Sequence, residues 1–357
     1  MVRVSSLPNT DLKAPLLALA AAALFGISTP IAKLLVGNVT PVMMAGLLYL
    51  GSGTGLTALL VLRHIFGKKV EEASLARKDM PWLLGTIVFG GVLGPILLMW
   101  GLATTDAASA SLLLNLEAVA TLVIAWLVFR EHVDRKLFMG AIAIVLGAVL
   151  LSFEGGIGKG GWGVPLIALA CLSWGIDNNL TRKISAVDPV VLAAIKGLAA
   201  GAVNLSLAYA LGVSWPSISS TVAAMALGFV SYGLGLVLFI VALRHLGSAR
   251  TGAYYGTAPF LGALAAAAFL GATLTPMILI AGALMAFGAW LHLSERHTHE
   301  HAHEELEHEH RHSHDAHHQH AHAAGQQSSE PHSHPHRHLA MTHSHRHWPD
   351  VHHGHTH

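Results

Sequence analysis

Long apolar runs recur along this sequence, each close to the length that an α-helix needs to cross a lipid bilayer. A hydrocarbon core of about 30 Å requires roughly 20 apolar residues in a helix. Apolar residues make up 53% of the chain and Asp, Glu, Lys and Arg only 11%, a balance that suits lipid rather than water as the solvent. We therefore expect an all-α integral membrane protein. The runs predict ten membrane-spanning helices: 15–35, 41–62, 81–101, 108–129, 137–153, 163–181, 190–211, 221–243, 251–271 and 276–293.

Basic residues fall almost wholly on one side of these ten spans. Lys and Arg accumulate in loops that stay in the cytoplasm. If the N-terminus is inside, fourteen basic residues before position 294 lie in cytoplasmic segments, whereas only Lys33 and Lys159 lie outside. We therefore expect a multi-pass protein of the plasma (inner) membrane with its N- and C-termini in the cytoplasm.

The second half of the chain resembles the first. LFGISTPIAK at 24–33 aligns with SWGIDNNLTR at 173–182, and residues 115–131 align with 256–272. Because each half holds five spans, the second copy enters the membrane from the opposite side, as in many secondary transporters. Chance matching of Ala, Leu and Gly is the alternative. The expected domains are a cytoplasmic segment at 1–14, a first five-helix repeat at 15–153, a linker at 154–162, a second five-helix repeat at 163–293 and a tail at 294–357.

Several of these segments resemble a known family. ASLLLNLEAVATLVIAWLVFRE, the HVDRK hairpin and MGAIAIVLGAVLL are similar to the EamA domain of the drug/metabolite transporter superfamily, and SARTGAYYGTAPFLGALAAAAFLG is similar to its second copy. The resemblance implies a ten-helix transporter whose central cavity is lined by helices one, three, four, six, eight and nine. Its members mostly move small metabolites, amino acids or drugs outward. Glu117 stands where the family has a Glu-Pro pair, but Ala118 replaces the proline.

Three ionisable residues lie within the expected spans: Glu117, Asp177 and Lys196. A charge near the bilayer centre costs about 2.5 to 3.5 kcal/mol, so such residues have a function or a paired structural role. Glu117 could titrate with substrate or proton, or stay neutral and hydrogen-bond to Thr121 or another helix. Asp177 and Lys196 are equally distant from the loop between their helices, which predicts an ion pair that could act as a gate. The alternative is that Lys196 reaches the cytoplasmic surface.

Polar side chains at helical spacing add candidates for a substrate site. Trp174, Asp177 and Asn178 are spaced to share one helix face, and Ser111 and Asn115 lie four residues apart. Such groups could equally join two helices. We expect Asn178 and Asn204 to lie beside the ion pair. The candidate substrate-binding or gating residues are Ser111, Asn115, Glu117, Trp174, Asp177, Asn178, Lys196 and Asn204.

The end of the chain is rich in histidine. Of the 27 histidines, all but four follow residue 296, mixed with Glu, Ser, Arg and Pro. With little apolar surface to bury, residues 294–357 should be disordered without a ligand. Neutral imidazole binds Zn, Ni, Co and Cu, so we expect divalent metal ions at this tail, in many overlapping sites. The candidate ligands are His297, His299, His301, His303, His308, His310, His312 and His314.

Three functions fit these features. The first is secondary transport of a small polar solute, in the export direction, by alternating access. The second is export of a transition metal with a metal-sensing tail, but the histidines before the tail all lie near cytoplasmic ends of spans, without the carboxylate cluster that a metal path needs. The third is a membrane-anchored metal buffer that transports nothing. No GxSxG motif is present, and HExxH occurs only within the tail, at 299–303 and 308–312, where alternating histidines produce it by composition. We therefore expect no enzyme activity, no required cofactor and no nucleic-acid partner, and we leave a homodimer open.

Overall fold

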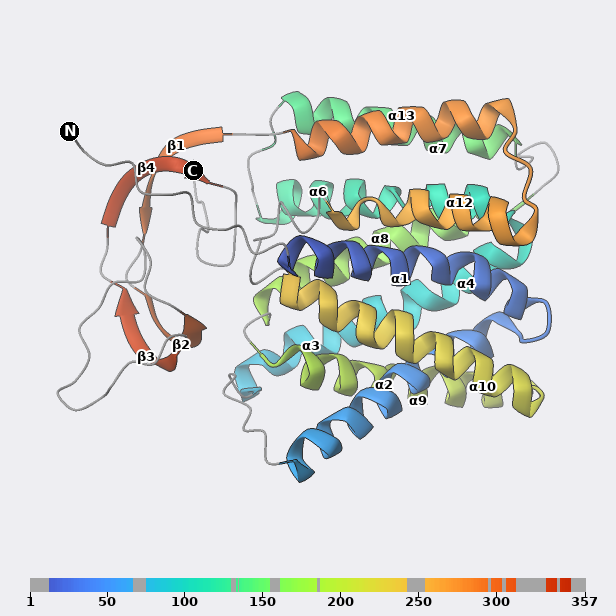
Figure 1. Cartoon of the computed structure of the whole chain (residues 1–357), viewed down its shortest axis with the longest axis horizontal. Coiled ribbons are helices and arrows are strands. Elements are labelled where there is room, and N and C mark those ends of the chain that lie inside the picture. Colours follow the sequence, from blue (N-terminus) through green and yellow to red (C-terminus); the bar gives the residue numbers. More distant parts are fainter. Residues whose placement is uncertain are drawn as a thin grey trace.

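The helices of this chain lie side by side in a layered bundle (Figure 1). The computed structural model describes residues 13–66, 75–129, 133, 135–154, 161–184, 187–242, 254–294, 297–303, 306–312, 332–338 and 341–347. Within these ranges, seven helical segments are long and apolar enough to cross a membrane: Ala14–Val36, Pro41–Ile65, Arg77–Thr104, Ala107–Val128, Arg135–Phe153, Pro189–Ala210 and Ile218–Ala242. Many of their large apolar side chains are exposed on the outside of the bundle, as in a multi-pass protein surrounded by lipid.

The elements of the bundle have the following bounds. The first part of the chain forms α1 (Lys13–Val36), α2 (Pro41–Ile65), η1 (Arg77–Asp79), α3 (Met80–Thr86), η2 (Ile87–Leu93), α4 (Gly94–Thr104), α5 (Ala107–Leu113), α6 (Leu116–Phe129) and α7 (Arg135–Glu154). The second part forms α8 (Gly163–Lys183), α9 (Pro189–Ala210), α10 (Ile218–Leu227), η4 (Gly228–Leu234), α12 (Ala258–Leu270) and α13 (Pro276–Leu293). Residues 235–242 continue η4 as α-helix.

Three further helices are shorter or less apolar than these seven segments. The apolar segments Ala258–Leu270 and Pro276–His292 are shorter than the seven spans. α8 has 21 residues, but its last two turns carry the polar sequence from Asp177 to Lys183. Two of the polar residues that lower the hydropathy of α8, Asp177 and Asn178, are among the candidates that the sequence marks for a site.

Helix starts follow local sequence signals. Pro41 and Pro189 each occupy the first turn of their helices, where the missing N–H would have no intrahelical partner. Asp106 accepts a hydrogen bond from Ser109 N at 2.8 Å, and Asp188 accepts one from Val190 N at 2.7 Å. These carboxylates cap α5 and α9 by satisfying free N–H groups.

The span predicted at 108–129 is interrupted, although Ala118 replaces the proline of the resembling family. α5 ends at Leu113 and α6 begins at Leu116. Glu117 N bonds to Leu114 O at 3.1 Å and Ala118 N bonds to Asn115 O at 3.2 Å, which is the tighter i to i−3 pattern. A corresponding turn at 256–257 precedes α12.

Two spans contain a stretch of π-helix. η2 and η4 are each seven residues long. A π-helix bonds each N–H to the C=O five residues earlier, which widens the turn and often marks a functional site. η2 begins at Ile87 and η4 at Gly228, an offset of 141 residues that also separates residues 115 and 256.

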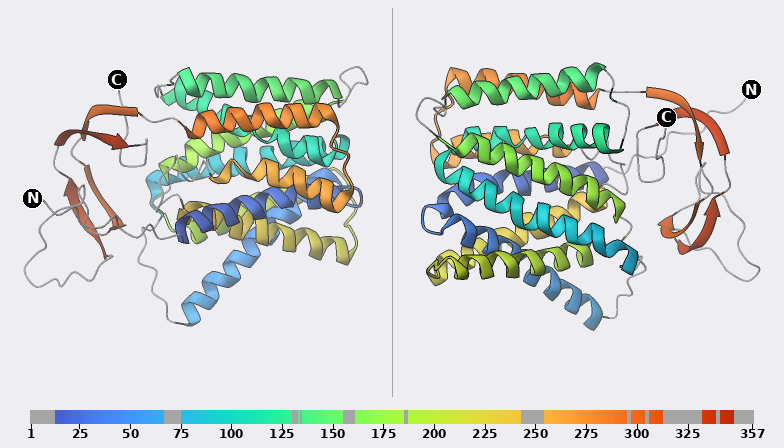
Figure 2. Two further views of the ribbon diagram at one scale, coloured as in Figure 1. Left: turned by 45° about the horizontal axis from the view of Figure 1, so that its top comes forward. Right: turned by 180° about the vertical axis from the view of Figure 1, so that it is seen from behind.

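Close helix pairs meet at glycines. α7 and α13 lie together along one edge of the bundle in both views of Figure 2. A Cβ added to Gly140 would lie 2.7 Å from Gly288 O, and one added to Gly288 would lie 2.6 Å from Gly140 O. α2 and α9 meet in the same way at Gly53 and Gly197. Small residues let the backbones approach, as in other membrane bundles.

The histidine-rich tail contributes four strands beside one end of the bundle (Figure 1). β1 (His297–His303) pairs antiparallel with β4 (Met341–His347), and β2 (Leu306–His312) pairs antiparallel with β3 (His332–His338). Each sheet has two strands, and isolated two-stranded sheets are only marginally stable in water. The expected disorder of residues 294–357 without a ligand therefore stays a prediction.

Candidate functional site

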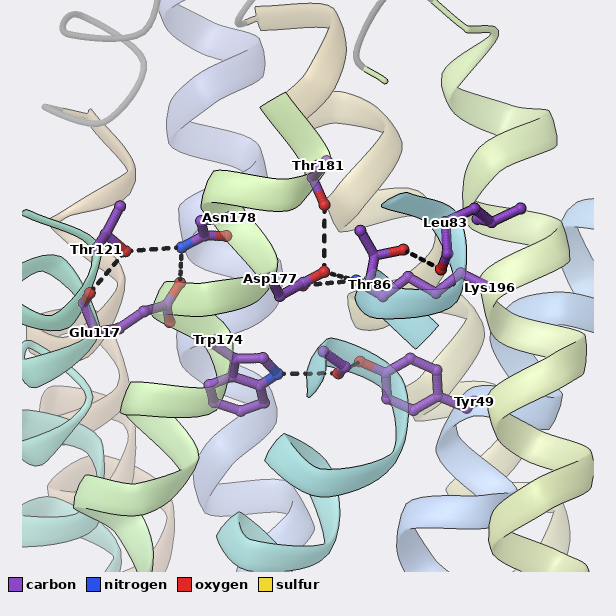
Figure 3. A network of polar contacts seen from close by, with 11 residues as sticks. Tyr49, Leu83, Thr86, Glu117, Thr121, Trp174, Asp177, Asn178, Thr181 and Lys196 are labelled. Carbon is purple, nitrogen blue, oxygen red and sulfur yellow. Dashed lines mark hydrogen bonds and ion pairs between the residues drawn. The ribbon is translucent and has the colours of Figure 1, made fainter. Parts of the chain in front are cut away.

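An ion pair joins α8 to α9 inside the bundle. Lys196 Nζ donates to Asp177 Oδ1 at 2.7 Å and to Oδ2 at 2.6 Å. The two residues are only 7% and 6% exposed, and Thr181 Oγ1 also donates to Asp177 Oδ1, at 3.2 Å. The predicted contact is therefore confirmed, and Figure 3 shows the lysine reaching across to the carboxylate. Pairing removes the cost of two isolated intramembrane charges.

The carbonyl groups of η2 hold three other helices. Gly90 O accepts hydrogen bonds from Tyr49 Oη at 2.6 Å and from Trp174 Nε1 at 3.1 Å. Gly91 O accepts one from Asn204 Nδ2 at 3.0 Å. These donors lie on α2, α8 and α9, so the π-helix is the point at which the three helices are joined. Figure 3 shows Tyr49 and Trp174 meeting at the same carbonyl group.

Glycine is required at position 90 by the ion pair itself. A Cβ added to Gly90 would collide with the carboxylate of Asp177. A Cβ added to Gly94, one turn later, would lie 2.6 Å from Trp174 Nε1. The backbone of this span therefore approaches α8 as closely as the functional side chains allow.

A second polar group lies on the opposite side of α8, against α6. Asn178 Nδ2 donates to Glu117 Oε1 at 2.8 Å and to Thr121 Oγ1 at 3.2 Å. Thr121 Oγ1 in turn donates to the backbone O of Glu117 at 2.8 Å. Asn179 Nδ2 donates to Thr121 O at 3.1 Å and to Gly175 O at 2.8 Å. Asn179, which the sequence did not single out, thus joins α8 to α6.

The two asparagines expected beside the ion pair bond elsewhere. Asn178 points toward Glu117, away from Asp177 (Figure 3). Asn204 bonds to Gly91 O. Consecutive helical residues lie about 100° apart, which turns Asn178 and Asp177 to different neighbours.

Among the described residues, the side-chain hydrogen bonds of Ser111 and Asn115 go to neither of these polar groups. Ser111 Oγ donates to Ala107 O at 2.7 Å, within its own helix. Asn115 Nδ2 donates to Leu112 O at 2.9 Å and contacts Met285 Sδ of α13 at 3.9 Å. Their role in substrate binding stays a prediction.

An aromatic cluster next to the ion pair was missed from the sequence. The ring of Phe25 lies 6.0 Å from that of Trp174, 5.9 Å from that of Tyr232 and 5.7 Å from that of Tyr255, measured between centroids. Tyr49 lies 5.5 Å from Tyr232. Aromatic pairs at such distances are attractive beyond their buried area. The alignment of Phe25 with Trp174 in the internal repeat was the signal that could have found the cluster.

The described helices give no support to a metal path. The described residues contain no group of three or more His, Cys, Asp or Glu side chains that could hold a metal ion. His292 Nε2 lies 3.0 Å from Leu137 O, where it joins α13 to the start of α7. Of the candidate ligands in the tail, His314 lies outside the described residues and the others lie on β1 and β2: His297, His299, His301, His303, His308, His310 and His312. Metal binding there stays a prediction.

Comparison with protein families decides the general class. A sequence model of the EamA-like transporter family matches residues 12–153 and again residues 161–294. The chain belongs to the EamA-like transporter family. The match confirms the resemblance in the sequence and the expectation of a membrane transporter, and members of such a family are not enzymes.

Several relatives of this EamA-family chain carry transporter names. An "uncharacterized transporter" from Methanothermobacter thermautotrophicus is 29% identical over 75% of this chain and 82% of its own length. A "probable terminal-alkyne amino-acid exporter" from Streptantibioticus cattleyicolor is 24% identical over 60% and 73%. The "uncharacterized inner membrane transporter YedA" of Escherichia coli is 25% identical over 70% and 81%. A crystal structure 22% identical in sequence superposes with a TM-score of 0.59, covering 78% of this chain and 95% of that one, and so shares the fold.

Proposed function

We propose that this EamA-family protein is a secondary transporter that moves a small polar solute out of the cell. In this proposal the two family matches are inverted five-helix repeats, residues 15–153 and 163–293, which alternate in opening the centre of the bundle to either side. The family match and the transporter names of the relatives support transport in general. The name of one relative as an exporter supports the outward direction.

Matched features in the two halves support the inverted repeat. The π-helices η2 and η4 have equal length and are 141 residues apart, and the turns at 114–115 and 256–257 precede α6 and α12. Gly26 of α1 lies against Ala258 of α12, while its aligned partner Gly175 of α8 would place a Cβ 2.8 Å from Ala120 of α6. The first helix of each half therefore packs on the fourth span of the other half.

The observation that carries the proposal is the Asp177–Lys196 ion pair, held against η2. Alternating access needs contacts with two discrete states, one closed and one open. A buried ion pair suits this role, because either charge can exchange its partner for a charged group of the solute at little extra desolvation cost. The tyrosine and tryptophan bonds to Gly90 O would move with the pair, since they end on the same turn.

Glu117 supplies a second charge-bearing group for the same pathway. Among the described residues, no Lys or Arg lies within 4.0 Å of its carboxylate, which accepts from Asn178. A carboxylate in this position could hold an amine of the solute or a proton, whereas a permanently neutral acid would serve only as a link between α6 and α8. The aromatic cluster around Phe25 would pack on apolar parts of the solute.

The proposal includes cytoplasmic termini and a metal-binding tail. The basic residues favour the cytoplasm for both termini. The tail would bind Zn, Ni, Co or Cu without taking part in the transport path. Protease added to the outside of intact cells should therefore leave residues 297–357 in place. Their removal by external protease would contradict a cytoplasmic C-terminus.

Transport can be tested in proteoliposomes that contain the purified chain. Uptake of radiolabelled amino acids, their amine analogues, Ni²⁺ and Zn²⁺ should reveal an organic solute whose uptake is lost in Asp177→Asn. A matched variant, Arg77→Gln, changes an exposed charge of η1 and should transport normally. Uptake of metal ions alone, or loss of uptake in both variants, would contradict the proposal.

Deletion of residues 297–357 separates the tail from the transporter. The shortened protein should insert, unfold and transport like the full chain but lose most of its metal binding in calorimetry. Loss of membrane insertion would contradict an independent tail, and loss of organic solute uptake would show that the tail belongs to the transport path.

A further inference from the structure

A groove runs between α6 and α7 on the outer surface of the bundle. Figure 2 shows these two helices side by side on the face seen from behind. The groove has a volume of about 280 Å³. Every residue that lines it is apolar: Val119, Leu122, Val123, Trp126, Val133, Phe138, Ala141, Ile142, Val145 and Leu146.

The walls of the groove are open to the surroundings of the protein. Trp126 is 49% exposed and Phe138 is 57% exposed, although both line the groove. In a membrane-spanning bundle such side chains meet hydrocarbon. An apolar groove of this kind does not hold ordered water, so its occupant is itself apolar.

Positive charge stands at one end of the groove. Val133 and Phe138 line that end, and the exposed Arg135 and Lys136 lie between them in the sequence, in the first turn of α7. In the sequence from Arg130 to Lys136, three basic residues stand against one Glu and one Asp, which gives this segment a net charge of +1 with His132 neutral. Arg and Lys are the side chains that bind phosphate, Arg with two parallel hydrogen bonds.

We propose that the groove between α6 and α7 binds an anionic phospholipid. One acyl chain lies along Trp126 and Ile142, and the headgroup phosphate lies on Arg135 and Lys136. The groove is wholly apolar and has a basic pair at one end. An anionic phospholipid has the matching arrangement, with a negative headgroup at one end and an apolar acyl chain beyond it. A second protein copy would need a broader surface with matching polar groups, and it forms an alternative outcome of the test. This site is separate from the Asp177–Lys196 pair and does not depend on the solute.

Fluorescence quenching of Trp126 tests the proposal in the full-length protein. The chain has eight tryptophans, so the signal of Trp126 is the difference between the wild type and Trp126→Phe. The probes are phosphatidylglycerol and phosphatidylcholine with the same brominated acyl chains, titrated into vesicles of unbrominated phosphatidylcholine. Brominated phosphatidylglycerol should quench Trp126 at a lower mole fraction, by about fivefold for each basic residue engaged.

Variants test whether the preference for phosphatidylglycerol depends on the basic residues of α7. The double change R135Q/K136Q should remove the preference for phosphatidylglycerol, while R77Q/K78Q, a matched pair of exposed basic residues in η1, should retain it. Ala141→Phe should fill the groove and lower quenching by both lipids. Each variant is compared with its own Trp126→Phe form, and the Trp126 emission before brominated lipid is added checks that the variant is folded. Added inorganic phosphate should leave the signal unchanged. Equal quenching by both lipids in the wild type, or Trp126 shielded from both in a protein that sediments as a dimer, would overturn the proposal.

Discussion

The two π-helices of this chain have the same length and the same place in the proposed repeats, but their surroundings differ in charge. Around η2 lie Asp177 of α8 and Lys196 of α9. The sequence alignment of 24–33 with 173–182 makes Ser28 the counterpart of Asp177. Pro41 and Pro189, which begin α2 and α9, make Leu48 the counterpart of Lys196. The region around η4 therefore has a hydroxyl and an alkyl group where the region around η2 has an ion pair.

This difference shows that the π-helical backbone and the ion pair beside it are separate features. Gly228 of η4 lies against Leu48, and Tyr232 of η4 interacts with the Ser28 hydroxyl. A charge at these two positions is therefore not required for the wide turn. The ion pair at η2 is an addition to one half alone. The aromatic cluster joins the two regions, because Tyr232 of η4 lies 5.5 Å from Tyr49, which donates to Gly90 O of η2.

The largest expected effect comes from removing one charge of the pair. Asp177→Ala leaves Lys196 buried without its partner and should lower the free energy of unfolding by about 3 to 5 kcal/mol. Ser28→Ala, the counterpart change, removes a hydroxyl that bonds to Phe25 O in its own helix and interacts with Tyr232, and it leaves no charge unpaired, so it should cost about 1 kcal/mol. Denaturant titration in mixed micelles measures both. Equal losses in the free energy of unfolding would contradict the difference between the two regions.

Charge reversal sharpens the same point for transport. Asp177→Lys and Lys196→Asp should each impair uptake of the solute found in proteoliposomes, because each places two like charges together. The double variant restores an ion pair of opposite direction and should recover part of the uptake. No recovery, with a folded protein, would argue that the two residues act independently.

A smaller loss is expected from adding one methyl group to η2. Gly90→Ala places a Cβ against the Asp177 carboxylate, and overpacking of this kind costs about 1 to 3 kcal/mol. Ser231→Ala changes the counterpart in η4 without adding a carbon atom and should cost less. The unfolding curves of the two variants provide the comparison, and a tolerant Gly90→Ala would mean that the ion pair can shift freely.

Single hydrogen bonds to η2 should contribute less again. Trp174→Phe keeps a ring beside Phe25 but removes one donor to Gly90 O, at a cost of about 0.5 to 1.5 kcal/mol. Tyr49→Phe removes the other donor. Because the second loss leaves the buried carbonyl without either donor, the double variant should lose more than the sum of the single changes. Simple additivity in the unfolding data would contradict a shared anchor.

The smallest change in stability is expected at Glu117. In Glu117→Gln the side-chain oxygen can still accept from Asn178, so the free energy of unfolding should change by about 0.5 kcal/mol or less. Uptake should nevertheless fall at least about tenfold if the carboxylate carries solute or proton. Unchanged uptake would favour the neutral, structural interpretation of this residue.

Some features of this protein follow from the sequence because they depend on residues close together along the chain. Hydrophobicity summed over about 20 residues places the membrane segments: the span expected at 108–129 is the segment Ala107–Val128, although the sequence did not predict the tight turn between α5 and α6. The contact between Asp177 and Lys196 was predictable because antiparallel neighbours with a short loop bring equidistant residues to one depth. The strong cost of an unpaired charge left few other arrangements.

Tertiary structure alone decided which neighbours the remaining polar groups meet. Asn178 bonds to Glu117 and Asn204 to Gly91 O, because each helix has a fixed rotation in the bundle that sequence spacing does not give. The π-helix of η2 contains only apolar residues and glycine, so no polar residue within it marks the site. Its position is set by close approach at Gly90, where the backbone meets Asp177 of a helix far along the chain. Sequence thus determined where charge could be tolerated, and packing determined which carbonyls and rings surround it.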